Sequence, residues 1–292
     1  MEKTELLDIE LFSGKENHDG FYINILENHL EAFHKDISVP HKHDFYVAVL
    51  FTHGSGVHEV DFTSYAVSRG ALFFLNPGQT HHWELSDDIS GYVFLHTRAF
   101  YEQHYTQNRL SQFPFYYSIH NMPVVMLDKD ETQSVEELFA NALHESLSND
   151  LMKRQKLLSL VDLIYIESTR EYLKINNDTA ASGPYSDIYI RFEALVERNF
   201  LTIKSPSQYA DMLAISAKHL NRIAKAVAGK TASDIIQDRV LLEAKKELLL
   251  HRDNFAEIAA YLGFEDYAYF SRVFKKRTSE TPSEFVGRYR TT

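Results

Sequence analysis

Apolar and polar residues follow two different rhythms along this chain, and the change of rhythm divides it. From about residue 20 to residue 127, apolar residues form short continuous or alternating runs, which Gly, Pro, Asn and His residues separate. The clearest runs are DFYVAVLF, SGVHEVDF, GALFFLNPG and SGYVFLHT. Runs of this length, rich in Val, Phe and Tyr, are typical of the strands in a β-barrel or β-sandwich. The pattern therefore predicts a β-barrel domain over residues 1–127.

A helical rhythm replaces this pattern at about Asp130. In two segments separated by the sequence SNDL, apolar residues recur at spacings of about three and four. They are Leu138, Leu143, Leu147, Leu157, Leu158, Val161, Leu163 and Ile164. Stripes this broad need a partner surface, which is either the chain's own barrel or a second copy of the chain. The pattern predicts a pair of helices over residues 128–175.

The segment 176–185 separates these helices from a helical C-terminal region. Its sequence, NNDTAASGPY, is small and polar and contains one Gly-Pro pair, which is typical of a linker. Helical periodicity continues through residues 186–292. The predicted fold class is therefore α+β and multidomain, with a β-barrel, a helical pair and an all-α C-terminal domain.

Charge is distributed unevenly along the sequence. The chain of 292 residues carries a net charge of −11. Residues 1–184 hold 13 Lys and Arg residues against 27 Asp and Glu residues, whereas residues 185–292 hold 17 against 14. The first part therefore carries a charge of −14 and the second +3. This asymmetry favours a polyanionic partner for the C-terminal part.

Several protein classes are excluded or disfavoured by what the sequence lacks. It contains no cysteine, which excludes disulfides, thiolate zinc sites and cysteine nucleophiles, and which fits a reducing compartment. The N-terminal sequence MEKTELLDIELF has neither the basic start nor the apolar run of a secretion signal. No stretch approaches the roughly 18 apolar residues of a membrane span. We therefore expect a soluble, cytoplasmic protein without a membrane partner.

The C-terminal region repeats itself at an offset of 49 or 50 residues. Pairs related in this way are Ala210 and Ala259, Ala214 and Gly263, Ser216 and Asp266, Arg222 and Arg272, Lys225 and Lys275, and Thr231 and Thr281. Each copy has a helix with a small residue inside, a tight turn, a second helix behind an N-cap, and a third helix that starts at threonine. This order predicts a helix-turn-helix unit, because a small residue lets the second helix cross the first closely.

The second helix of each copy has an apolar and a polar face. The apolar faces include Leu220 and Ile223 in the first copy and Phe270 and Phe274 in the second, which we interpret as core residues. The polar faces carry Lys218, Asn221, Arg222 and Lys225 in the first copy, and Tyr267, Tyr269, Arg272, Lys275 and Lys276 in the second. A solvated charged face is the ordinary explanation for one such helix. Two copies at matching positions instead favour DNA, because Arg and Asn can hydrogen-bond base edges in the major groove.

The sequence FAEIAAYLGFEDYAYFSRVFKKRTSETPSEF resembles the signature region of AraC/XylS-type transcription regulators, and the repeat extends over residues 186–292. The resemblance implies two helix-turn-helix units joined by one long helix, here ASDIIQDRVLLEAKKELLLHR. It also implies recognition helices about 34 Å apart, one turn of DNA, which enter successive major grooves. Ala214 departs from the pattern, since the second turn has Gly263, and we expect the first turn to be less tight.

By position, the resemblance assigns DNA contacts to two sets of residues. Those that match base-facing positions are Lys218, Asn221, Arg222, Tyr267, Ala268, Tyr269 and Arg272. Those expected near phosphates are Lys225, Lys275 and Lys276, which would orient the protein on DNA without reading its sequence.

The N-terminal half resembles a cupin barrel, the usual sensor domain of these regulators, over roughly residues 20–110. Its two motifs are PHKHDFYVAVLFTHGSG and GALFFLNPGQTHHWE. His41 and His43 match a metal-binding His-x-His pair, and His81 matches a later ligand. The usual carboxylate is missing, with Tyr46 near its position. We therefore favour a barrel without a metal or other cofactor.

The barrel histidines allow three interpretations. The favoured one is a small-molecule effector pocket at the barrel mouth, lined by His41, His43, Gln79, His81 and Trp83. The second is a polar rim satisfied by neighbouring groups and water. The third is a metal site at His41, His43 and His81. Trp83 alone is more often a core residue than a platform for a ligand.

Together these features predict a sequence-specific regulator of transcription with no catalytic residues. Binding of an effector in the barrel would change how the DNA-binding domain is presented. By resemblance, residues 128–175 would form a homodimer, RNA polymerase would be a partner, and activation is the commoner outcome. Two alternatives stay open: a metal-dependent cupin enzyme fused to a DNA-binding domain, and an architectural DNA-binding dimer that responds to no ligand.

Overall fold

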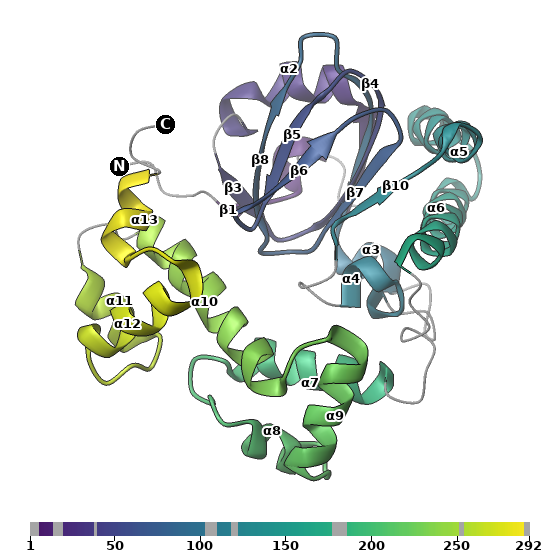
Figure 1. Ribbon diagram of the computed structural model, residues 1–292. Helices are drawn as coiled ribbons and strands as arrows, with labels where there is room; N and C mark the ends of the chain where they lie inside the picture. Colours follow the sequence, from purple (N-terminus) through teal and green to yellow (C-terminus); the bar gives the residue numbers. More distant parts are fainter. Residues whose placement is uncertain are drawn as a thin grey trace. The chain divides into compact units, whose positions relative to one another are not determined.

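The structure is a computed structural model that describes residues 6–13, 20–37, 40–102, 110–117, 122–176, 186–250 and 254–288. The chain divides into two compact units, Met1–Asp178 and Thr179–Thr292 (Figure 1). The predicted linker, residues 176–185, lies outside the described residues except for Asn176, where a helix ends. Among the helices in the described ranges, none combines the length and apolar character needed to cross a membrane.

The first unit contains two five-stranded sheets in its described part, with strand orders β1-β3-β8-β5-β6 and β10-β7-β4-β9-β2. The strands are β1 (Leu6–Leu7), β2 (Phe21–Ile25), β3 (His41–His43), β4 (Tyr46–His53), β5 (Gly56–Val60), β6 (Thr63–Val67), β7 (Ala71–Leu75), β8 (Thr80–Leu85), β9 (Ser90–His96) and β10 (Val124–Met126). The four apolar runs singled out in the sequence form β4, β5, β7 and β9. The expected β-rich N-terminal domain is therefore confirmed.

Helices accompany these sheets: α1 (Glu10–Ser13), α2 (Leu26–Ile37), α3 (Arg98–Glu102), the 3-10 helix η1 (Leu110–Gln112), α4 (Pro114–Tyr117), α5 (Lys129–Leu147) and α6 (Lys153–Asn176). The sequence interpretation of residues 20–127 as strands alone is wrong at α2. The missed signal is the helical spacing of Leu26, Leu30 and Phe33. Leu26 is buried in the core between the two sheets, and Leu30 and Phe33 pack against that core.

Strand β4 is buried on both of its faces. Val47, Val49 and Phe51 point into the apolar core between the two sheets. Tyr46 and Leu50 point the other way, into a second core that α5 and α6 cover. Its uninterrupted apolar sequence follows from this double burial, since neither face meets water.

Helices α5 and α6 lie side by side against the second sheet (Figure 1). Phe139 of α5 and Tyr165 of α6 are fully buried, with ring centroids 5.2 and 5.9 Å from that of Phe94 in β9. The two helices break at the predicted sequence SNDL. The sequence left two partner surfaces open for the apolar stripes of α5 and α6. The chain's own barrel covers at least the buried residues of these stripes.

The second unit is entirely helical in its described part, as predicted. Its helices are α7 (Ser186–Asn199), α8 (Pro206–Met212), α9 (Ala217–Ala228), α10 (Ala232–Leu250), α11 (Phe255–Tyr261), α12 (Tyr267–Thr278) and α13 (Pro282–Arg288). Helices α8 and α9 form the first helix-turn-helix unit, and α11 and α12 form the second. Helix α10 joins them and, with 19 residues, is roughly 28 Å long.

Two arginines connect α10 to the rest of this unit. Arg239 is buried, and its guanidinium donates to both carboxylate oxygens of Glu197 in α7, at 2.6 and 2.9 Å. Arg277 of α12 donates to Asp234 near the start of α10, at 2.8 Å. Hydrogen bonds between a guanidinium and a carboxylate are strong and directional, so both arginines fix the helices that they join.

Candidate nucleic-acid interface and sensor site

The two helix-turn-helix units have the same turn. Ala210 and Ala259 are both 1% exposed where the paired helices cross. The turn residues that follow have a left-handed backbone in both copies, with φ of 55° at Ala214 and 78° at Gly263. The expectation of a less tight first turn is therefore wrong, because Ala214 adopts the conformation that usually favours glycine.

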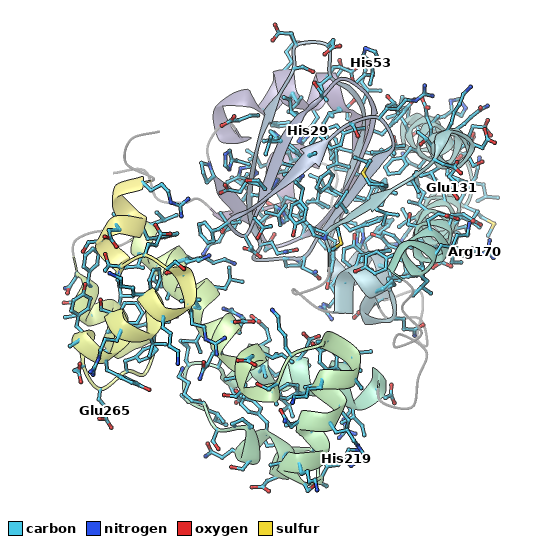
Figure 2. The ribbon with its side chains drawn as sticks, in the orientation of Figure 1. His29, His53, Glu131, Arg170, His219 and Glu265 are labelled. Atoms are coloured by element: carbon cyan, nitrogen blue, oxygen red, sulfur yellow. The ribbon has the colours of Figure 1, made fainter. Side chains whose placement is uncertain are left out.

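Equivalent residues also begin the two recognition helices α9 and α12. The Ser216 side chain accepts a hydrogen bond from the backbone N–H of His219 at 3.1 Å. Asp266 accepts one from the N–H of Tyr269 at 2.6 Å. Both predicted N-caps are confirmed. The offset changes from 49 to 50 because the second turn holds one extra residue, Glu265, which is exposed (Figure 2).

The apolar faces of α9 and α12 form the cores of their units, as predicted. Leu220, Ile223, Phe270 and Phe274 are each no more than 1% exposed. Because these side chains are fully used for packing, each recognition helix presents its polar face outward.

On α9, three of the four predicted DNA-contacting residues are exposed: Lys218, Arg222 and Lys225. Asn221 is different. It is half-buried, and its Oδ1 accepts a hydrogen bond from the backbone N–H of Ala232 at 3.1 Å, at the start of α10. This bond holds the Asn221 side chain against α10 and uses one of the two lone pairs of its oxygen, so Asn221 has a structural role whether or not it also reads a base.

On α12, the exposed residues among the predicted DNA contacts are Ala268, Tyr269, Arg272, Lys275 and Lys276. The guanidinium carbon of Arg272 lies 5.9 Å from the ring centroid of Tyr269, so the two predicted base-reading side chains are neighbours. Tyr267 is half-buried, and its ring stacks on Phe255 of α11 with centroids 6.0 Å apart. Part of its ring therefore serves packing.

In the N-terminal unit, the structure brings together four of the five residues predicted to line an effector pocket. His41 in β3 is paired with His81 in β8, and their ring centroids are 4.4 Å apart. The His81 ring also lies 5.1 Å from that of His43 and 5.3 Å from that of Trp83. Gln79 is not part of this group, because its side chain binds Asp61 and the backbone N–H of Asn76.

The sequence interpretation missed His58, which joins this histidine cluster from β5. Its Nε2 shares a hydrogen bond of 3.0 Å with Nδ1 of His81. Burial lowers the pKa of His58 to about 3 and lowers the pKa of His81 well below its ordinary value, and neighbouring histidines add to both shifts. Both imidazoles are therefore neutral near physiological pH. One signal could have found His58: it lies two residues before the apolar Val60 in a predicted strand, so both side chains point to the same, inward face.

The space among these histidines is small. The cavity lined by His41, His43, His81, Trp83 and His29 has a volume of about 10 Å³. This is roughly the room that one water molecule needs. Within the described ranges, no group of three or more His, Asp or Glu side chains is placed to hold a metal ion. In this conformation the histidines and Trp83 pack against one another.

Two protein families match the chain. An AraC-like ligand binding domain matches residues 29–161, and a helix-turn-helix domain matches residues 209–288. The chain is 25% identical over 252 residues to the HTH-type transcriptional activator RhaS of Enterobacter sp., covering 84% of this chain and 86% of RhaS. It is 22% identical over 262 residues to the HTH-type transcriptional activator RhaR of Escherichia coli, covering 87% and 89%. The structure of unsaturated fatty acid bound ToxT from Vibrio cholerae aligns with 93% of this chain and 96% of ToxT, at 16% identity and a TM-score of 0.44.

Proposed function

Because the chain belongs to the AraC family of DNA-binding transcriptional regulators, we propose that it activates transcription in response to a small molecule bound by its N-terminal domain. The family consists of transcription factors, which removes the alternative of a cupin enzyme with a DNA-binding tail. The match to an AraC-like ligand binding domain favours a ligand-responsive regulator over an architectural one. RhaS and RhaR are named activators, which supports activation here.

One observation carries the DNA-binding part of the proposal: α9 and α12 offer matching exposed cationic faces from two copies of one unit. Arg222 and Arg272 occupy equivalent positions, and both are exposed. Helix α10 between the units is roughly 28 Å long, close to the repeat of about 34 Å that separates successive major grooves on one side of DNA. The two recognition helices would thus read adjacent grooves of one double helix.

Roles within these faces follow from exposure and chemistry. Arg222 and Arg272 would form bidentate contacts with guanine. The other side chains proposed to approach base edges are Lys218, Ala268, Tyr269 and, for its exposed part, Tyr267. Lys225, Lys275 and Lys276 would contact phosphates and set the position of each helix on the duplex.

We also propose that the chain acts as a homodimer through α5 and α6, and that RNA polymerase is its partner on DNA. Leu147 and Leu151 support the dimer, since both apolar side chains lie at the turn that joins α5 to α6 and are 79% and 94% exposed. Large exposed apolar side chains that lie close together mark interaction surfaces. A dimer would place four helix-turn-helix units on DNA and raise affinity through effective concentration.

The DNA-binding proposal is tested with Arg222→Ala and Arg272→Ala in the full chain. The target is a site recovered by genomic footprinting of the bound wild-type protein. Each variant should bind this site about 1–3 kcal/mol more weakly. The melting temperature should change little, because both side chains are exposed. Wild-type discrimination between the target and a random duplex in both variants would contradict the proposal.

Lys275→Ala is the matched control. It removes a neighbouring exposed cation proposed to contact phosphate rather than bases. Affinity should fall for target and random DNA alike, and the slope of log affinity against log salt should decrease by about one. A loss confined to the target site would assign Lys275 to base reading instead.

A further inference from the structure

The N-terminal unit has a second and much larger cavity, away from the histidine cluster. This cavity, the β2–α6 cavity, has a volume of about 520 Å³, against about 10 Å³ among the histidines. Pockets for small ligands usually measure about 300–1,000 Å³. It lies between strand β2, helix α3 and the turn that joins α5 to α6. Its principal lining residues are Phe12, Phe21, Phe100, Met152, Lys153 and Arg154.

An aromatic stack forms one wall of the β2–α6 cavity. The rings of Phe21 in β2 and Phe100 in α3 are stacked, with centroids 4.8 Å apart and an angle of 22° between their planes. Both side chains are buried, at 4% and 1% exposure, so their positions are fixed by packing. Leu157 of α6 completes an apolar surface. The edge of this wall and the more exposed Tyr22 and Met152 give the cavity its apolar lining.

Cations stand beside this wall, at the first turn of α6. The Lys153 ammonium donates to the backbone oxygens of Ser146 and Ser148 at 2.6 and 2.9 Å, which holds it at the cavity. An ammonium has three N–H donors, so one more can reach a ligand. The Arg154 guanidinium carbon lies 5.1 Å from the centroid of Phe100. Among the described lining residues there is no Asp or Glu, although the first 184 residues carry a net charge of −14.

The backbone at this turn adds to the positive potential. Met152 precedes α6 and has a left-handed backbone, with φ of 64°. Its side chain has no oxygen to accept hydrogen bonds from the first turn of the helix, unlike the Ser, Thr, Asp or Asn common at that position. The positive end of the dipole of this 24-residue helix therefore lies at the cavity, where it favours an anion.

We propose that the β2–α6 cavity binds a small organic carboxylate with an apolar body, and that this molecule is the effector. Its body lies on the Phe21–Phe100 stack, and its carboxylate meets Lys153, Arg154 and the start of α6. The assignment of effector rests on the proposed regulatory function, whereas the binding site does not. A ligand here contacts both the barrel and the helical pair, so its binding favours one arrangement of these two parts over another.

The test measures binding of matched probes to the full chain by calorimetry. Phenylbutyrate supplies a carboxylate on an apolar body, phenylbutanol replaces the carboxylate with a neutral hydroxyl, and inorganic phosphate supplies charge alone. Phenylbutyrate should bind at one site per chain, at least about tenfold more tightly than phenylbutanol, because a charged hydrogen bond is lost in the alcohol. Phosphate should not bind measurably. Equal affinity for the acid and the alcohol would overturn the proposal.

Variants locate the site. Lys153→Met should weaken phenylbutyrate by about tenfold or more and leave phenylbutanol unchanged. Lys153→Arg, which keeps the charge and the donors, should restore most of the affinity and guards against a loss that reflects folding alone. Lys174→Gln removes a cation at the far end of the same helix, where it pairs with Glu131 and Glu171, and should bind as the wild type does. Wild-type affinity in Lys153→Met, or an equal loss in Lys174→Gln, would overturn the assignment.

DNA binding of the same samples separates this proposal from the one before it. If phenylbutyrate fails to bind while the target site is still distinguished from random DNA, the carboxylate site is wrong and the regulatory function stands. If phenylbutyrate binds but no DNA is distinguished, the site stands as a binding site and the role of effector falls with the regulator.

Discussion

The first helix-turn-helix unit, α8 and α9, and the second, α11 and α12, adopt the same backbone with residue types exchanged. At the turn, the first unit has Ala214 with φ of 55° and the second has Gly263 with φ of 78°. At the end of the recognition helix the exchange is reversed, with Gly229 at 66° and Ser279 at 68°. Each unit thus places one residue with a side chain in the left-handed region, at opposite ends of its recognition helix.

The surroundings explain why Gly263 is required, whereas Gly229 only avoids the backbone strain that a side chain would bring at positive φ. A Cβ atom at Gly263 would lie 2.7 Å from the carbonyl oxygen of Leu201, which is too close for any side chain. A Cβ at Gly229 would meet nothing within 4 Å. Left-handed geometry costs a residue with a side chain about 1 kcal/mol, which a packed unit can carry. Close approach of another segment, and not the turn itself, makes glycine necessary at Gly263.

The largest effect on this comparison should come from emptying the core behind one recognition helix. Phe270→Ala should destabilise the second unit by roughly 3–5 kcal/mol, and Leu220→Ala the first unit by roughly 2–5 kcal/mol. Denaturant unfolding followed by far-ultraviolet circular dichroism measures both. Trp83 is the only tryptophan of the chain, so its fluorescence reports the barrel separately. An equal shift in the barrel transition would show that the helical C-terminal domain does not unfold independently of the barrel.

A smaller effect is expected where the two glycines differ. Gly263→Ala should cost roughly 2–3 kcal/mol, because it adds a clash with the Leu201 carbonyl to the strain of the backbone. Gly229→Ala, which creates strain in open space, should cost about 1 kcal/mol. Equal costs in the same unfolding experiment would remove the clash as the reason for glycine at the second turn.

The smallest effect should come from relieving the strain that each unit carries. Ala214→Gly and Ser279→Gly should each stabilise the chain by roughly 0.5–1 kcal/mol, since glycine adopts positive φ without cost. Ala226→Gly, at an exposed position of ordinary helix in α9, should destabilise by a similar amount. Destabilisation by all three substitutions would mean that the left-handed residues are not strained.

Local pattern was sufficient to predict the C-terminal unit but only part of the N-terminal one. The N-caps at Ser216 and Asp266 and the buried Phe270 depend on residues close in sequence, and all were predicted. Helix α2 was missed because its segment is short and mostly polar, and the neighbouring apolar runs led us to interpret the whole region as strands. Strand β8, THHWEL, was not among the predicted runs, since three of its six residues are His or Trp.

The candidate sites show the same limit more sharply. Exposure of Arg222 and Arg272 follows from helical period alone. The bond between Asn221 and Ala232, and the one between Gln79 and Asp61, join segments that no local pattern relates. Cavity volumes are still less accessible, because they depend on how side chains from two sheets and several helices fill a common space. For this reason the histidine side chains occupy most of the space that was predicted to be a pocket, while the larger cavity is lined by residues that belong to no recognised motif.

Strand β4 also limits which substitutions this sequence can accept during evolution. A strand with one wet face can exchange every second residue freely, whereas consecutive positions from Tyr46 to Phe51 all meet packed atoms. Related chains that recognise other molecules should therefore differ little in size at these positions and vary instead at the rims of the sheets. The strand separates the core between the two sheets from the core that α5 and α6 cover, so a substitution on either face acts on a backbone that both cores contact.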